Sequence, residues 1–404
     1  MLEDIAYSTY KKKSDIHGTV LYPAVMIAPM QKEVLETLLD DTEIKSIFDP
    51  FHGSGTALYE AAKINPNLSL YGCDINPLAN LITKVKLQGV DNDILSDIKF
   101  LESQINSNTN ITPYDFPNID KWLRPDVKKD IAKIRTAIIK IANTKNRLYF
   151  WYMLCDIIRR YSNTRSSTYK LHIKTKTMID NLKNNLIKDY ISSIKDNVEQ
   201  FKEVSKNYTL TKFNTLELLP ALNNNSFDIT ITSPPYGDNA TTVPYGQFSM
   251  LALYTIPGND LDLEGWELNN FSMIDSKSMG GWRTTNTLNE QDKEFILPYL
   301  NQISEAKHKK VILFFSDYFK FLKEISRITS KYIVITLGNR TVDGVQIDLS
   351  GITQEYLLEQ NYQVIKSADR KIAYKRTPSV TSKVNDAPVK SMNKEYITVF
   401  KKIK

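Results

Sequence analysis

Two short apolar segments, joined by a glycine turn and a helical pattern, stand near the start of the chain. Residues 46–49 read as a buried strand, residues 53–55 as a tight turn, and Thr56–Ile64 as a helix. A second strand pattern, Leu68–Cys73, ends at Asp74, and a further helix is expected from about residue 77. A doubly wound nucleotide-binding sheet begins in this way, with an acid after its second strand. The sequence therefore predicts an α/β fold built on a Rossmann-like sheet.

The pattern changes after residue 90. Residues 91–204 show mostly helical periodicity, and this segment is far longer than an ordinary loop. Strand patterning resumes at Tyr208 and again before Ser233. We therefore predict one cofactor-binding and catalytic domain made of residues 17–90 and 205–404, interrupted by a large helical insertion.

The second half of the chain alternates between strand and helix patterns. Residues 237–286 are expected to be irregular because glycine and proline recur there. Residues 309–328 favour a long amphipathic helix over a strand at Val311–Phe315, since apolar residues continue at helical spacing. Later expectations are a buried strand at 331–339, a helix at 351–361, a closing hairpin at 362–376, a polar loop at 377–395 and a short strand at 396–400.

The composition is that of a soluble globular protein. The 404 residues are 42% hydrophobic and 24% charged, and no apolar run approaches the ~20 residues that span a bilayer. Two cysteines, Cys73 and Cys155, and four histidines supply neither a disulfide framework nor a metal-ligand cluster. Together with the absence of a secretory leader, these features favour a cytoplasmic protein with no membrane segment and no metal.

The glycine turn is a candidate ligand site. A turn of this kind lets backbone N–H groups and a helix N-terminus approach a ligand closely. A dinucleotide fingerprint would need glycine where Leu58 stands, and a P-loop would need Gly-Lys-Ser/Thr where Gly55 is followed by Thr56-Ala57. The alternative is a turn that only packs the helix against the sheet.

Two acids end the first two strands. Asp74 can accept hydrogen bonds from both hydroxyls of a ribose, and its alternative role is to cap the helix that begins near Asn76. Asp49 would lie beside the same crevice, where it could meet a positively charged group of the ligand.

A rigid hook follows the strand pattern at residues 227–232. Ser233-Pro234-Pro235-Tyr236 cannot continue a sheet, because neither proline has an N–H to donate. The prolines fix backbone carbonyls, Ser233 supplies a hydroxyl, and Tyr236 supplies a ring face. This set suits a planar heterocycle that carries an exocyclic amine, although an unremarkable double-proline turn is the alternative.

Three motifs in this order resemble those of a known family. "DPFHGSGT", "GCDINP" and "TSPPYGD" are similar to the motifs of S-adenosylmethionine-dependent DNA amino-methyltransferases, the SPPY-type enzymes of restriction-modification systems that act on cytosine N4 or adenine N6. The resemblance extends to "HGTVLYPAVM", "VPYGQFSMLALYTI" and "GNRTVDGVQIDLSGIT". In the insertion only "RRYSNTRSSTYK" matches, and loosely. The resemblance implies a Rossmann-like methyltransferase sheet.

The resemblance also assigns roles to residues. Those implied for the methionine part of the cofactor are Tyr22, Pro23, Asp49, Phe51, Gly53, Gly55 and Thr56. Asp74 would bind the ribose, and Asn214 stands where the family often has an acid near the adenine. Ser233, Pro234, Pro235 and Tyr236 would form the catalytic loop.

A basic run marks the insertion. Between Asp156 and Asp180 there is no acidic residue, and the candidate DNA-binding residues there are Arg159, Arg160, Arg165, Lys170 and Lys174. Serine, threonine, asparagine and tyrosine side chains are interleaved with them, as in many contacts to phosphate oxygens. The alternative is a solvated basic face. We expect double-stranded DNA as the partner, and a cognate restriction endonuclease as a further one.

The predicted reaction moves a methyl group from S-adenosylmethionine to the exocyclic amine of a flipped-out base. In the family that the chain resembles, serine at the first position of the loop occurs more often with cytosine N4, so the resemblance implies cytosine N4 as the target of the Ser233 loop, with adenine N6 as the alternative. An RNA amino-methyltransferase and a non-catalytic specificity subunit are the remaining alternatives. A prokaryotic cytoplasm, where DNA binding would associate the protein with the nucleoid, is the expected location.

Overall fold

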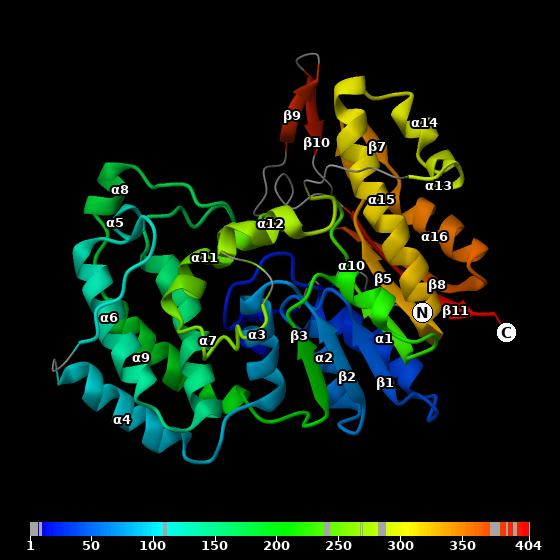
Figure 1. Ribbon diagram of the computed structural model, residues 1–404. Coiled ribbons are helices and arrows are strands. Elements are labelled where there is room, and N and C mark those ends of the chain that lie inside the picture. Colours follow the sequence, from blue (N-terminus) through cyan, green and yellow to red (C-terminus); the bar gives the residue numbers. More distant parts are fainter. Residues whose placement is uncertain are drawn as a thin grey trace.

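A seven-stranded sheet lies at the centre of the computed structural model, which describes residues 7, 10–107, 111–237, 243–266, 268, 270–281, 288–371, 380–384, 387–390 and 394–403 (Figure 1). The strand order is β3-β2-β1-β4-β5-β11-β8. The strands are β1 (Ser46–Asp49), β2 (Ser69–Cys73), β3 (Tyr208–Thr211), β4 (Phe227–Thr232), β5 (Thr329–Leu337), β8 (Tyr362–Lys371) and β11 (Lys394–Lys402). Neighbours are parallel from β3 to β5, and β11 is antiparallel to both β5 and β8. The predicted α/β fold with a Rossmann-like sheet is confirmed.

Helices cover both faces of this sheet. Along β5, Val334 joins one apolar core, whereas Ile333 and Ile335 join the other, because successive side chains of a strand point to opposite faces. The first core includes side chains of α1 (Ala28–Leu39) and α2 (Thr56–Ile64), and the second includes those of α15 (Glu305–Ile328) and α16 (Leu349–Glu359). Burial on both faces explains why the last residues of β1, β4 and β5 are all buried, including the threonines of β4.

The helices of residues 91–204 gather on the left of Figure 1. They are α4 (Ile94–Asn106), α5 (Ile119–Trp122), α6 (Pro125–Ile139), α7 (Thr144–Tyr161), α8 (Lys176–Asp180) and α9 (Leu186–Asn197), followed by the 3₁₀ turn η3 (Val198–Gln200). Except for α8, which has no buried residue, they contribute apolar side chains to the same continuous core as α1, α2 and α3 (Pro77–Gln88). The division into a catalytic domain and an insertion remains a prediction.

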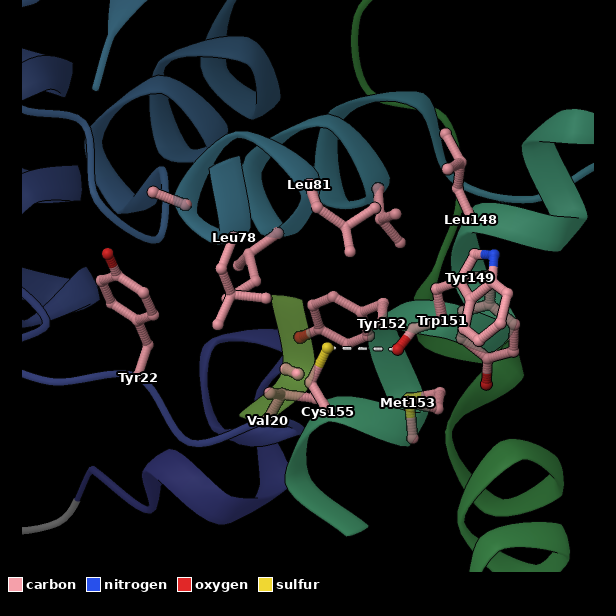
Figure 2. Close-up of a cluster of buried hydrophobic side chains, with 14 of the residues drawn as sticks. Val20, Tyr22, Leu78, Leu81, Leu148, Tyr149, Trp151, Tyr152, Met153 and Cys155 are labelled. Atoms are coloured by element: carbon pink, nitrogen blue, oxygen red, sulfur yellow. Dashed lines mark hydrogen bonds between the residues drawn. The ribbon is translucent and has the colours of Figure 1, made fainter. Parts of the chain in front are cut away.

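Helix α7 fixes these helices to the rest of the molecule. Figure 2 shows its aromatic side chains, among them Trp151 and Tyr152, in one cluster with Leu78 and Leu81 of α3 and with Val20 of the N-terminal segment. Tyr152 and Trp151 are almost completely buried, and the Tyr152 hydroxyl lies 2.5 Å from Thr19 Oγ1. A helix buried on nearly all sides holds a fixed position against its neighbours.

The remaining elements are short. They are η1 (Lys12–Ser14), η2 (Ile16–Gly18), α10 (Thr215–Leu218), η4 (Leu219–Ala221), α11 (Tyr245–Thr255), η5 (Phe271–Met273), α12 (Ile274–Lys277), α13 (Glu290–Glu294), α14 (Leu297–Leu300), and the hairpins β6 (Arg340–Val342) with β7 (Val345–Ile347) and β9 (Val380–Val384) with β10 (Ala387–Lys390). Among the described residues, no helix combines the length and the apolar character that crossing a membrane requires.

Most expected elements are confirmed: β1, α2, β2 and α3, then the long helix α15, the strand β5 and the helix α16. The prediction that residues 237–286 are irregular is wrong for α11, whose Phe248 and Leu251 are buried. The glycine and proline that suggested a loop, Pro244 and Gly246, lie at the start of this helix, where both are tolerated. Residues 238–242, 267, 269 and 282–287 lie outside the described residues.

The expected C-terminal hairpin and loop also need correction. β8 pairs along its length with β11, so the predicted hairpin within residues 362–376 is wrong in its described part, while residues 372–376 lie outside it. The segment 377–395, expected to be a loop, contains β9 and β10 as an antiparallel pair, with residues 377–379, 385–386 and 391–393 outside the described residues. The strand expected at 396–400 is longer, because β11 has partners on both sides.

Candidate active site

A cavity of about 840 Å³, including its open mouth, lies where β1, β2 and β4 end. Parallel sheets bind ligands at this edge, at the point where the strand order reverses, which here is between β1 and β4. The predicted site residues that line the cavity are Tyr22, Pro23, Phe51, Gly53, Thr56, Asp74, Asn214, Ser233 and Pro235. Segments that are far apart in the sequence therefore form one cavity wall.

The glycine turn needs its glycines. Gly53 and Gly55 have φ angles of 50° and 70°, in the left-handed region that side chains other than glycine rarely adopt. A Cβ at Gly55 would lie 2.5 Å from the Thr83 side chain of α3. Gly55 is also the residue immediately before α2, so the turn presents the N-terminus of α2 beside the cavity.

Asp74 holds the turn from the neighbouring strand. One carboxylate oxygen accepts the Gly53 N–H at 3.1 Å, and the other accepts the Asn76 N–H at 2.8 Å. Burial raises the pKa of Asp74, while His52 and these two N–H groups oppose the rise. The residue that caps α3 is Asn76, whose side chain accepts the Leu78 N–H, so Asp74 does not have the alternative capping role.

Asp49, the last residue of β1, is fully buried and does not line the cavity. One carboxylate oxygen accepts the Phe51 N–H at 3.1 Å, and its Oδ2 has no hydrogen-bond partner among the described residues. Burial raises the pKa of Asp49 to about 7. A buried oxygen without a donor fits a site that receives a cationic group from a ligand.

An N-terminal segment forms the opposite wall. Tyr22 and Pro23 line the cavity, and the Tyr22 hydroxyl accepts a hydrogen bond from the Asn76 side chain at 3.2 Å. Asn76 donates a second hydrogen bond to Ser249 of α11 at 2.8 Å. One amide group therefore joins the N-terminal wall to the helix that follows the loop after β4.

Asn214 lines the far end of the cavity. Its side-chain oxygen accepts the Leu216 N–H and caps α10, and its amide donates to Glu217 at 3.1 Å. Sequence reasoning missed the cavity residues of and just after α12, which are Ile274, Lys277, Ser278 and Met279. No strong pattern marks this short helix, because it has a single turn within a segment rich in serine and glycine.

The loop after β4 is divided between the cavity and the protein interior. Ser233 and Pro235 line the cavity, whereas Pro234 is buried. The Tyr236 ring packs against the second core, and its hydroxyl lies 2.9 Å from Ser233 Oγ. Burial raises the pKa of Tyr236 well above its usual value, so its hydroxyl keeps its proton. Tyr236 therefore contacts the cavity residue Ser233 through its hydroxyl, but its ring does not line the cavity as the sequence predicted.

Helix α11 connects this loop to the helices of residues 91–204. Tyr245 at its start lines the cavity, and Asp275 of α12 accepts the N–H groups of Gly246 and Gln247 at 2.9 and 3.1 Å. A carboxylate at a helix N-terminus is favourable because it meets N–H groups that have no partner within the helix. Phe248 of the same helix packs against Tyr169, with ring centroids 6.0 Å apart.

The basic run includes residues with different roles. Arg159 is only 7% exposed, donates to the carbonyls of Thr168 and Tyr169 at 2.6 and 3.1 Å, and stacks 4.5 Å from the Phe248 ring centroid. Such a side chain fixes the loop between residues 164 and 174 and does not reach a partner in solution. Direct DNA contact by Arg159, as expected from its charge, therefore has no support in the structure.

The other basic side chains are more accessible. Arg160 is paired with Asp156 at 2.7 Å, and Lys174 donates to the Ser162 carbonyl at 2.5 Å. Arg165 is exposed, and Lys170 is half-buried. Arg165 and Lys170 thus belong to the loop that Arg159 holds, next to α11.

Comparison with known proteins adds an independent observation. The chain is 28% identical over 401 residues to the Type II methyltransferase M.MvaI of Kocuria varians, in an alignment that covers 91% of this chain and 87% of that protein. The chain is thus similar to a methyltransferase. Because the alignment covers 91% of the chain, the similarity is not confined to the sheet or to the helices between its two parts. No family model matches the chain.

Proposed function

We propose that this protein is an S-adenosylmethionine-dependent DNA methyltransferase that modifies the exocyclic amine of a flipped-out base, namely cytosine N4, with adenine N6 as the alternative. One observation carries the proposal: Ser233 of the loop after β4 lines the same cavity as Gly53 and Asp74. A hydroxyl suited to hold an amine and an acid suited to hold a ribose therefore share one cavity. The similarity to a Type II methyltransferase supports DNA as the substrate.

The cavity fits the proposed cofactor. S-adenosylmethionine would supply a methyl group on a positively charged sulfur. Asp74 would accept hydrogen bonds from the ribose hydroxyls, as acids after the second strand do in nucleotide-binding sheets. The free oxygen of Asp49 would accept the ammonium of the methionine part, and Asn214 would face the adenine. Gly53, Gly55 and Thr56 leave room for the ligand beside the N-terminus of α2.

Ser233 would orient the amine. A hydroxyl has one hydrogen to donate and two lone pairs to accept with. The protonated Tyr236 can donate to one lone pair of Ser233, 2.9 Å away. Ser233 then keeps a second lone pair for an amine N–H and its own hydrogen for a ring acceptor such as cytosine N3. Cytosine (N4 and N3) and adenine (N6 and N1) both present this pair of groups, so the preference for cytosine rests on the resemblance of the Ser233 loop to the family's N4-cytosine enzymes.

The cysteines support an amine as the target. Cys73 and Cys155 are both buried, and burial raises the pKa of the Cys73 thiol to about 11 and that of Cys155 further. A thiol in such an environment is a poor nucleophile, so methylation through a cysteine adduct on the base has no support here. Transfer to an amine needs no such adduct, and it depends on how the amine nitrogen is positioned.

Double-stranded DNA would lie over the cavity mouth and the loop of residues 164–174. The exposed Arg165 and the half-buried Lys170 would contact phosphates, and the target base would leave the duplex to reach Ser233. A cognate restriction endonuclease would be the functional partner in the cell.

Methyl transfer from isotope-labelled S-adenosylmethionine to duplex DNA and to RNA tests this proposal. We expect label in duplex DNA, a loss of at least ~100-fold in rate for Ser233→Ala, and wild-type rates for Ser226→Ala, an exposed serine at the opposite end of the same strand. Label in RNA alone, or no dependence on Ser233 in an enzyme that methylates DNA, would contradict it.

A further inference from the structure

A buried chain of polar groups lies behind the glycine turn. Lys86, near the end of α3, is only 2% exposed, and its Nζ donates to the Ser54 carbonyl at 2.9 Å. The same Nζ lies 3.3 Å from His17 Nδ1, and His17 Nε2 lies 2.9 Å from Glu60 Oε1 of α2. The chain therefore connects the N-terminal segment, two helices and the turn, and none of its three side chains lines the cavity.

The proton positions follow from the contacts. A lysine Nζ that donates to His17 Nδ1 requires the histidine proton on Nε2, from which it is donated to Glu60. Burial, and then the nearby Lys86, lowers the pKa of His17, so this histidine is neutral. Burial lowers the pKa of Lys86 to about 7, with Lys12 adding to the decrease and Asp15 and Glu60 opposing it. The other charged groups that act on this chain are Lys32 and Lys63.

The turn depends on Lys86 for one of its backbone groups. The Ser54 carbonyl stands between two glycines with left-handed φ angles, ahead of α2 and beyond the end of β1. Among the described residues, no backbone N–H of α2 or of the sheet donates to it, and its donor is Lys86. A buried carbonyl that loses its donor is costly, so a turn without Lys86 would change its conformation.

We propose that Lys86 is a positioning residue for the cofactor, which holds the glycine turn through the Ser54 carbonyl, and that the chain of Glu60, His17 and Lys86 sets the charge behind that turn. The inference rests on the proposed function, because it assumes that the turn holds S-adenosylmethionine. It assigns a role to three buried side chains that the proposed reaction does not otherwise use.

The net charge of the Glu60–His17–Lys86 group changes with pH. Below about pH 7 the ammonium of Lys86 balances the carboxylate of Glu60, and above it the neutral amine leaves one negative charge. Both forms of Lys86 keep enough N–H groups for Ser54 and His17. The added negative charge attracts the positive sulfur of S-adenosylmethionine but not the neutral sulfur of S-adenosylhomocysteine. The preference for S-adenosylmethionine should therefore increase as the pH rises through 7.

Calorimetric titration of both ligands between pH 6 and pH 8.5 tests the proposal without any methyl transfer. For the wild-type protein we expect the affinity ratio of S-adenosylmethionine to S-adenosylhomocysteine to rise on the order of threefold. Lys86→Met should bind both ligands about tenfold more weakly, with a pH dependence of the ratio that is smaller than in the wild type, because Asp49 near the same cavity also titrates near pH 7. Lys84→Met, a partly exposed lysine on the same helix, is the matched control and should behave as wild type.

A second variant keeps the test decisive if Lys86→Met does not fold, which circular dichroism would reveal. Glu60→Gln keeps an acceptor for His17 and removes the charge, so it should weaken the preference for S-adenosylmethionine and move the pH step lower. A folded Lys86→Met protein with wild-type affinities, or a wild-type ratio that is constant with pH, would overturn the proposal. Failure of the wild-type protein to bind either ligand would instead refute the proposed function itself.

Discussion

The Tyr236 hydroxyl is a small group with a specific expected effect. In Tyr236→Phe the ring still packs in the second core, but the hydroxyl 2.9 Å from Ser233 is lost. One neutral hydrogen bond contributes about 1 kcal/mol, so we expect the single-turnover rate of methyl transfer to fall about fivefold with unchanged cofactor affinity. A rate equal to that of the wild type would show that the ring alone matters.

Asp49 should link stability to pH. Because burial raises its pKa from 3.8 to about 7, the folded protein holds a proton that the unfolded chain has lost. The stability contributed by this proton is complete below about pH 4 and is lost as the pH rises to 7. We expect Asp49→Asn to raise the free energy of unfolding of the ligand-free protein at pH 8, on the order of a few kcal/mol, with little change near pH 4.

The same substitution should weaken cofactor binding, because the free oxygen of Asp49 would be replaced by an amide nitrogen. Thermal unfolding at the two pH values, together with calorimetry at pH 8, measures both effects. An Asp49→Asn protein that is equally stable at pH 8 would contradict the raised pKa of Asp49, and one that binds the cofactor as the wild type does would contradict its role in cofactor binding.

Single residues of the site could be found in the sequence where the chemistry is local. Gly53, Gly55 and Asp74 stand out because their positions follow directly from the ends of two strands. Arg159 could not be assigned in this way, since its burial depends on α11, which is about ninety residues later in the chain. The contacts between Lys86, His17 and Glu60 could not be predicted for the same reason, because these three side chains come from three separate segments.

At the scale of elements, the loop of residues 164–174 carries the expected DNA contact. The double variant Arg165→Glu with Lys170→Glu removes two cations without disturbing Arg159. We expect weaker binding to duplex DNA and a salt dependence whose slope falls by about 2, since fewer counterions are released. Lys188→Glu, an exposed lysine on α9, is the control. Unchanged affinity and slope would indicate that the loop is only a solvated basic surface.

Elements with a strong internal pattern were predictable, and those that depend on a partner were not. Helix α15 has apolar residues at helical spacing from Val311 to Ile328, so its type is clear from the sequence. The β6–β7 hairpin was missed although Asp343-Gly344, with φ angles of 48° and 81°, is a strong turn signal between short strands. The strand β8 was given the wrong partner because β11, its actual neighbour, follows far later.

At the scale of the whole molecule, the sheet and the helices of residues 91–204 act as one support for the cavity. The helix α7 shares a core with α3 (Figure 2), and α11, which follows the loop after β4 in the chain, contacts α7. The basic loop, the cavity wall and Ser233 are therefore held in fixed relation by buried contacts. Such rigidity suits a reaction whose rate depends on the alignment of an amine with a methyl group.

The identity of the methylated base tests this account most directly. The protein would be incubated with S-adenosylmethionine and duplex DNA of varied sequence, and the DNA digested to nucleosides for mass spectrometry. The account predicts N4-methylcytosine, formed by the wild-type protein and not by Ser233→Ala. N6-methyladenine alone would contradict the assignment of the base, and the absence of any methylated nucleoside from a folded, cofactor-loaded protein would contradict the proposed function.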